Sequence, residues 1–139
     1  MKQIKLRLNA IEKALSLEII NVSPTPIRIW SMKCSWGYDS IYFQVSERNR
    51  NKCLIRRKPT IWTVNLPDAV TIQPGQAHVE KFDLTDETWD LSGLINLQPD
   101  IDFYAVIEIV PDTYTIKFNV IEGRSESNKL QLKSYLINK

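Results

Sequence analysis

Few residues in this chain could carry out catalysis or hold a metal ion. Among its 139 residues there is one histidine, His78, and there are two cysteines, Cys34 and Cys53. A structural zinc site needs four cysteine or histidine ligands in close pairs, and these three residues stand apart in the sequence. A serine–histidine–acid triad would have to use His78, and no Gly-x-Ser-x-Gly motif accompanies it. We therefore predict that the chain is not an enzyme and that it needs no metal or other cofactor.

The charged residues form two groups of opposite sign. Residues 48–58 carry six basic side chains and no acid, whereas residues 80–102 carry seven of the sixteen acids and one base. The formal net charge of +2 is too small for a strong general attraction to nucleic acid or to an anionic membrane. A basic ribbon could enter a major groove, but such charges also protect an exposed sheet edge from pairing. We expect a bipolar surface, and neither nucleic acid nor membrane as a partner.

Aromatic residues in predicted loops add candidate contacts, because tryptophan and tyrosine are common in interface hot spots. Trp36 and Tyr38 lie in a loop predicted at 32–39, and Trp89 lies in the segment 85–99, whose structure the sequence does not define. Indole rings also stack on sugars, so a carbohydrate-binding module is an alternative. The complete set of predicted partner contacts is Asp83, Asp86, Glu87, Trp89, Asp90, Trp36, Tyr38, Arg48, Arg50, Arg56 and Arg57.

The elements that must position these residues are predicted to be almost entirely β-strands. Alternating apolar residues at 15–22 and 27–30 flank Ser-Pro-Thr-Pro, a pattern typical of strand, turn and strand. Residues 4–8 predict an edge strand, 41–56 a hairpin, and 103–110 a central strand that is apolar on both faces. Segments 61–64 and 114–121 are also predicted to be strands. Pro74-Gly75 suits a type II turn, and 85–89 predicts one helical turn.

Seven to nine short strands with a turn about every ten residues are typical of an immunoglobulin-like sandwich. We therefore predict one domain over residues 1–139, all-β, built as an antiparallel β-sandwich with at most one short helical turn. A chain of this length buries enough surface to fold without disulfides or metals.

Three segments carry a resemblance to a known group of proteins. These are the strand pair at 15–30, Ser35-Trp-Gly-Tyr38 and Gln73-Pro-Gly-Gln76. In these segments the chain resembles small bacterial immunoglobulin-like domains, a group that includes the intracellular proteinase inhibitor fold. The likeness extends from about residue 13 to residue 134. These motifs are turns and packing residues, so the resemblance implies a β-sandwich and assigns no catalytic or binding residue.

Because the predicted domain is small and carries no catalytic motif, we expect it to act by binding a specific protein partner. Our first hypothesis is a bacterial immunity or inhibitor protein, in which the acidic segment 80–102 enters the basic active site of a toxin, steered there by complementary charge. An intracellular proteinase inhibitor that presents the 32–39 or 85–99 loop is the alternative, besides the carbohydrate-binding module. We expect no small-molecule substrate. The charged N-terminal residues Lys2, Lys5 and Arg7 do not fit a signal peptide, which predicts a cytoplasmic protein if the chain is complete.

Overall fold

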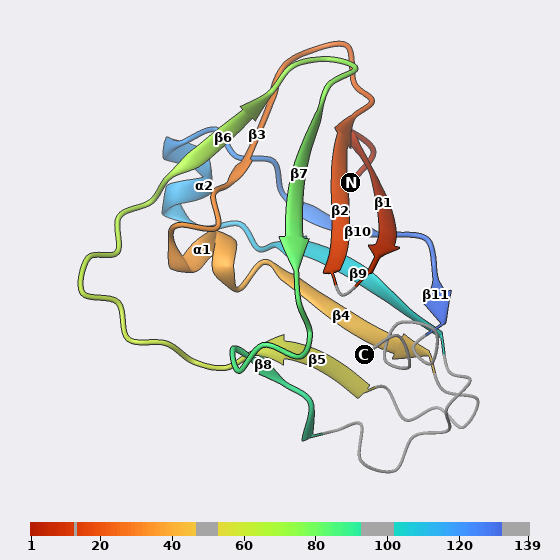
Figure 1. Cartoon of the computed structure of the whole chain (residues 1–139). Coiled ribbons are helices and arrows are strands. Elements are labelled where there is room, and N and C mark those ends of the chain that lie inside the picture. The colour runs from red at the N-terminus through yellow and green to blue at the C-terminus, as the bar shows by residue number, and fades with distance from the viewer. Residues whose placement is uncertain (13, 47–52, 93–101, 132–139) are drawn as a thin grey trace.

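Strands dominate the computed structural model of the chain, which describes residues 1–12, 14–46, 53–92 and 102–131. The elements are β1 (Ile4–Ile11), β2 (Ala14–Asn21), β3 (Ile27–Trp30), α1 (Ser35–Tyr38), β4 (Ile41–Ser46), β5 (Cys53–Arg57), β6 (Ala69–Ile72), β7 (Ala77–Phe82), β8 (Trp89–Asp90), β9 (Asp102–Ile109), α2 (Thr113–Lys117), β10 (Gly123–Glu126) and β11 (Leu130–Gln131) (Figure 1). The predicted all-β antiparallel sandwich is confirmed. Eleven strands and two helices in the described residues exceed the expected seven to nine strands and one helical turn.

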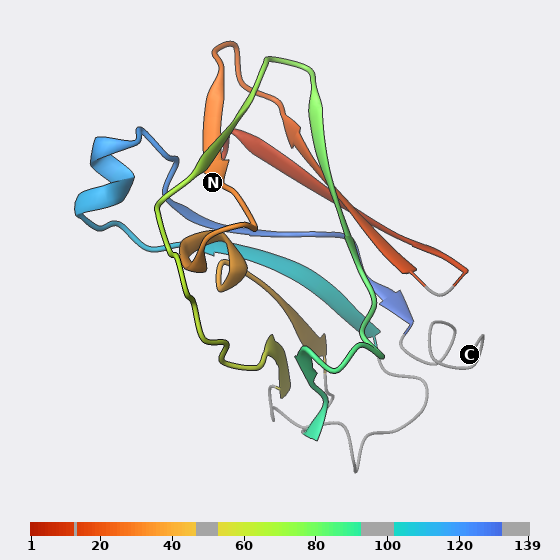
Figure 2. The ribbon, with the colours of Figure 1, turned by 60° about the vertical axis from the view of Figure 1, so that its left-hand side comes forward.

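The described strands form three antiparallel sheets. One has the order β1-β2-β7, a second has the order β10-β9-β4-β5-β8 with β11 also paired to β9, and β3 pairs with β6. Figure 2 shows the first two sheets as separate layers, and side chains from both layers belong to one core. The β3–β6 pair lies at the end of the molecule that also carries both helices (Figure 1).

Alternating side chains place β1 and β2 on the core. Ile4, Leu6 and Leu8 of β1 are buried, whereas Lys5 and Arg7 between them are exposed. β1 and β2 pair along their whole length, from Ile4 opposite Asn21 to Ile11 opposite Ala14. β1 is the first strand in its sheet, so the predicted edge strand at 4–8 is confirmed.

The predicted central strand is also confirmed. β9 lies between β4 and β10, and its residues Phe103, Ala105, Val106 and Ile107 are buried, so both faces of the strand are covered. β4 pairs with β5 as the predicted hairpin requires, although the turn at 47–52 lies outside the described residues.

The turn before β7 has the predicted type II geometry. Gly75 has a φ of +76°, and the backbone N–H of Gln76 donates to the carbonyl of Gln73 at 3.0 Å. A positive φ at the third position of a turn is the reason that glycine is favoured there.

Three local predictions are wrong. Residues 61–64 form no strand, residues 85–88 form turns rather than a helical turn, and α2 occupies the start of the strand predicted at 114–121. The helix forms because Asp112 caps it: its Oδ1 accepts hydrogen bonds from the N–H groups of Tyr114 and Thr115, both at 2.8 Å. The Thr115 hydroxyl accepts in turn from the N–H of Asp112, which completes a capping box.

No helix in the described part of the chain is both long and apolar enough to span a bilayer.

Candidate functional site

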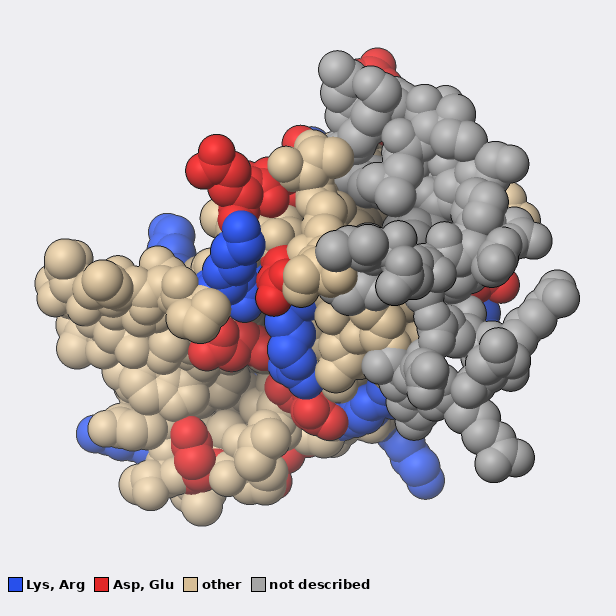
Figure 3. Space-filling model, turned by 90° about the horizontal axis from the view of Figure 1, so that it is seen from below, with Lys and Arg blue, Asp and Glu red and all other residues tan. Residues whose placement is uncertain are grey.

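The basic and acidic segments lie side by side rather than at opposite poles. β5 pairs with β8, so that Arg56 lies opposite Asp90 and Arg57 opposite Trp89. Figure 3 shows Lys and Arg side chains interleaved with Asp and Glu side chains across the middle of this face. The expectation of a bipolar surface is therefore wrong for the described residues, because a sheet pairing that the sequence did not reveal brings the two groups together. Arg48 and Arg50 lie outside the described residues.

Trp89, which we predicted as a contact, belongs to the core. It is 4% exposed, and its ring packs edge-on against Phe43 and Phe82 with centroid distances of 5.3 and 5.7 Å. The β5–β8 pairing turns this indole inward, because successive strand residues point to opposite faces of a sheet. Trp89 is thus unavailable to a partner.

The acids around Trp89 are exposed, and three of them stabilise turns. Asp83 Oδ1 accepts from the N–H and the hydroxyl of Thr85, and Asp86 Oδ1 accepts from the N–H of Thr88 at 2.9 Å. Asp90 Oδ1 accepts from the N–H of Ser92 at 3.0 Å, and hydrogen bonding to Ser92 holds the pKa of Asp90 below its ordinary value. These three short acidic side chains each accept hydrogen bonds that stabilise a turn. Glu87 is exposed, and no such hydrogen bond is seen for it within the described residues.

Arg57 lies among aromatic rings. Its guanidinium carbon is 4.5 Å from the centroid of Tyr38, 5.1 Å from that of Trp89 and 5.3 Å from that of Phe82. Partial burial lowers the pKa of Arg57, and the negative charge of Glu80 is among the groups that oppose this shift. An arginine remains charged at neutral pH, so the rings hold a cation in a fixed position.

Trp36 and Tyr38, both on α1, contact different parts of the molecule. The Trp36 ring packs on Trp30 and on Tyr114 of α2, at centroid distances of 5.8 and 5.1 Å, and its Nε1–H donates to Asp112 Oδ2 at 3.1 Å. The Tyr38 ring instead meets Trp62 edge-on at 5.6 Å. The structure therefore places these two predicted contacts at the junction of α1, α2 and the connection between β5 and β6.

That connection, residues 58–68, is here called the 58–68 loop. It is irregular but attached at several points: the Tyr38 hydroxyl donates to the Lys58 carbonyl at 3.2 Å, and the Ser31 N–H donates to the Asp68 carbonyl at 2.8 Å. Between these ends, the Asn65 side chain accepts from the Ser35 N–H and donates to the Ser35 hydroxyl, at 3.0 and 2.7 Å. The loop is thus attached to the body of the protein at Lys58, Asn65 and Asp68.

The 58–68 loop and α2 expose large apolar side chains at one end of the molecule. Six residues in these segments and just before α2 are 41–94% exposed, and we call this set the apolar end: Ile61, Val64, Leu66, Val110, Tyr114 and Ile116. Figures 1 and 2 show the loop, α1 and α2 together on the same side of the sheets, and uncharged surface dominates the left of Figure 3. The sequence analysis missed this surface. Pro59 and Pro67, which cannot donate to a ladder, were the signal that 61–64 is no strand.

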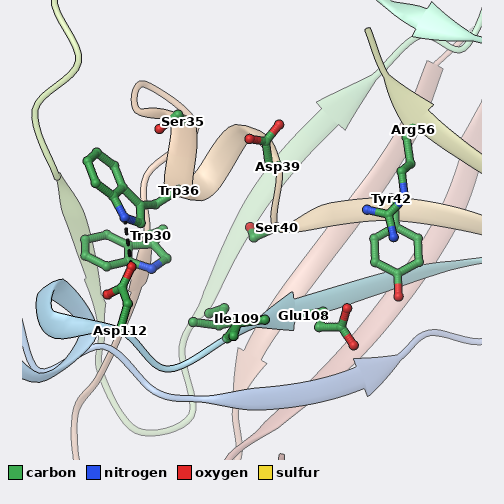
Figure 4. A pocket seen from close by; sticks show the side chains of 11 residues that line it. Trp30, Ser35, Trp36, Asp39, Ser40, Tyr42, Arg56, Glu108, Ile109 and Asp112 are labelled. Carbon is green, nitrogen blue, oxygen red and sulfur yellow. Dashed lines mark hydrogen bonds between the residues drawn. The ribbon is translucent and has the colours of Figure 1, made fainter. Parts of the chain in front are cut away.

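A pocket of about 350 Å³ opens beside the apolar end, between α1 and the second sheet. Figure 4 shows Trp30 and Trp36 at one side of it, Tyr42 and Arg56 at the other, and Ser40 and Ile109 between them. The guanidinium of Arg56 lies 4.1 Å above the Tyr42 ring. The remaining lining residues are Ser35, Asp39, Glu108, Val110 and Asp112.

The three residues that could have supported catalysis are not brought together. His78 Nε2 lies 2.7 Å from Glu80 Oε1 on β7, and both side chains are partly exposed. Cys34 is a free thiol that is fully buried, with its Sγ donating to the Ser31 carbonyl, and Cys53 is half-buried at the start of β5. Within the described ranges, no group of three His, Cys, Asp or Glu residues could hold a metal ion.

Comparisons with protein-family models, with curated proteins and with solved structures found no match for this chain.

Proposed function

We propose that this chain is a non-enzymatic protein-binding domain whose contact surface is the apolar end. The observation that carries the proposal is that six exposed, large apolar side chains lie on the 58–68 loop and on or just before α2, which share one end of the molecule. Scattered apolar side chains are normal on a protein surface, whereas a gathered set of them marks a site that a partner covers.

The way in which the loop is held supports this proposal. Residues 59–67 carry no charge, and contacts with Tyr38 and Ser35 fix the loop while Ile61, Val64 and Leu66 stay exposed. A segment that is already ordered loses less conformational entropy on binding, so its apolar side chains contribute more to affinity. The loop projects to the left of the sheets in Figure 1, a shape that fits a concave partner surface.

The partner class that we favour is an enzyme whose active site the domain blocks, as an immunity or inhibitor protein does to its cognate toxin. The pairing of β5 with β8 makes the acidic segment a poor choice for the blocking element, because Arg56 and Arg57 lie next to its carboxylates. We therefore assign the contact to the 58–68 loop, with Trp36 and Tyr38 supporting it.

An intracellular proteinase inhibitor is the second candidate. The favouring observation is that the 58–68 loop is attached at both ends and in its middle while it exposes aliphatic side chains, which suits the cleft of a peptidase. The loops predicted for that role, 32–39 and 85–99, are less suitable, because α1 packs on the body of the protein and Trp89 is buried.

The test compares capture of a partner by variants of the immobilised chain. A lysate of the source organism is passed over wild type, an Ile61→Ser/Leu66→Ser variant and an Ile11→Ser/Val22→Ser variant. Ile11 and Val22 are 63% and 54% exposed but lie outside the apolar end, so the third variant is the matched control. The captured protein is identified, purified and titrated directly against each variant.

We expect wild type and control to bind one protein equally, and the loop variant to bind it at least tenfold more weakly. We also expect the partner's enzymatic activity to fall on binding to wild type. Equal affinity of all three variants would overturn the proposal. Sedimentation of wild type alone as a dimer, abolished by Ile61→Ser/Leu66→Ser, would also overturn it, because a second copy would then cover the surface.

A further inference from the structure

We propose that the pocket between Trp36 and Tyr42 binds a neutral pyranose sugar. This inference goes beyond the proposed function and rests mainly on other side chains, although Val110 of the apolar end also lines the pocket and Tyr114 packs on Trp36. The pocket is about 350 Å³, within the range of small-ligand sites, and its lining mixes aromatic rings with carboxylates, hydroxyls and a guanidinium.

The aromatic wall supplies a surface for the apolar face of a sugar ring. Trp36 is half-buried, rests on the buried ring of Trp30 and is fixed by its hydrogen bond to Asp112. An indole that is already held in place by packing and a hydrogen bond loses little freedom when a ligand stacks on it. Tyr42 of β4 lies on the other side of Ser40 and Ile109 (Figure 4), where it is 5% exposed and the Arg56 guanidinium lies over its ring.

The polar groups on the rim include both acceptors and donors. Asp39 and Glu108 supply carboxylate oxygens, which only accept hydrogen bonds, and Arg56 supplies N–H groups, which only donate. Glu108 is also 4.0 Å from Arg124, but its side chain is 41% exposed and stays accessible. Asp112 has less to offer, because its carboxylate already accepts from Trp36, Tyr114 and Thr115.

The charges of the lining decide between classes of ligand. An anion would be repelled by the carboxylates of Asp39, Glu108 and Asp112, whereas a cation would be attracted by these carboxylates and repelled by the guanidinium of Arg56. A neutral polyol avoids both repulsions, and each of its hydroxyls can donate to a carboxylate or accept from the guanidinium. The stacking surface favours a ring with an apolar face over an open-chain polyol.

The experiment follows the indole N–H signals of the protein by two-dimensional NMR. The sequence has four tryptophans, so Trp36 is assigned by the one signal that Trp36→Phe removes. The probes are glucose, galactose, mannose and N-acetylglucosamine, each titrated to about 100 mM so that a site with a dissociation constant of about 1 mM is saturated. Glycerol, inorganic phosphate and spermidine are titrated as the open-chain, anionic and cationic comparisons.

We expect at least one sugar to shift the Trp36 signal saturably, and Asp39→Asn and Glu108→Gln each to weaken its binding at least fivefold. Glu87→Gln, which removes an exposed carboxylate elsewhere, is the matched control and should bind like wild type. No saturable shift with any of the four sugars would overturn the inference. A shift caused equally by glycerol, or only by phosphate or spermidine, would overturn it as well.

Failure of this inference is separable from failure of the proposed function. The Ile61→Ser/Leu66→Ser variant should bind sugar like wild type while it loses the protein partner, and Glu108→Gln should do the reverse. Loss of sugar binding in the loop variant would show that the two surfaces are one site and would also overturn the inference.

Discussion

Gly37 has no space for a side chain, because α1 packs directly on the backbone of residue 31. A Cβ at this position would lie 1.9 Å from the Ser31 carbonyl oxygen and 2.4 Å from its carbon. Both atoms are backbone, so neither can move without displacing the end of β3 or the helix. Trp36 and Tyr38 flank Gly37, and this one residue therefore holds the junction of α1 with the 58–68 loop in place.

We predict that Gly37→Ala destabilises the protein by about 3 kcal/mol, the upper part of the usual range for overpacking. Gly75→Ala is the comparison: nothing lies within 4 Å of its Cβ, and only the positive φ of +76° opposes it, at about 1 kcal/mol. Urea denaturation of both variants measures the difference. Equal destabilisation would mean that α1 moves away from Ser31 at little cost.

Asp90 gives a prediction for pH dependence. Its carboxylate is fully exposed, and hydrogen bonds from Ser92 lower its pKa from the ordinary value of 3.8. A depressed pKa means that folding favours the ionised form of Asp90. The resulting stabilisation is fully present above the pKa that Asp90 has in the unfolded chain, and it disappears as the pH falls through the lower pKa of the folded protein. We predict that Ser92→Ala raises the pKa of Asp90 toward 3.8, as measured by NMR titration of the side-chain carboxyl carbon. An unchanged pKa would show that the backbone N–H of Ser92 supplies the whole effect.

At the scale of elements, the 58–68 loop is the segment on which the proposed function depends most. Its order comes from side chains of other elements, chiefly Ser35 and Tyr38 of α1. Nothing in the composition of 61–64 distinguishes an isolated extended segment from a strand, since both suit β-branched and aromatic residues. The strand assignment failed because none of the strands in the described residues pairs with this segment.

We predict that Asn65→Ala makes the loop more susceptible to proteolysis without unfolding the protein. The change removes two hydrogen bonds to Ser35, each contributing about 1 kcal/mol, so the loop opens more often. Limited proteolysis with mass spectrometry should show faster cleavage within 58–68. Thr63→Ala, at an exposed position of the same loop, is the matched control and should be cleaved like wild type.

At the scale of the whole molecule, the distribution of charge distinguishes binding through the acidic segment from binding through the 58–68 loop. An acidic segment that enters a basic active site gains its association rate from electrostatic steering, which salt screens. Residues 59–67 carry no charge, and the formal net charge of the chain is only +2.

We therefore predict that the association rate with the captured partner changes less than about threefold between about 0.05 and about 0.5 M NaCl, because screening acts only on charged contacts. Stopped-flow fluorescence measures this rate. A fall of tenfold or more would favour contact through the acids at Asp83, Asp86, Glu87 and Asp90 instead.

Period-two alternation in this sequence determined most of the fold by itself. Ile4, Leu6 and Leu8 alternate with charged or polar residues, and Phe103 to Ile109 is apolar on both faces, so the edge strand and the central strand could be predicted. Such patterns are local, because each strand records in its own residues which of its faces is buried.

Tertiary structure alone decided which surface is available for function. The pairing of β5 with β8 turned Trp89 inward and placed the arginines beside the acids, and the contacts of α1 with Asn65 and Tyr114 assembled the apolar end. These contacts join residues far apart in the sequence, and a single chain carries no local signal for which distant segments will meet. The sequence shows which residue types are present at these positions, but only the folded structure shows which of them are exposed and which residues they contact.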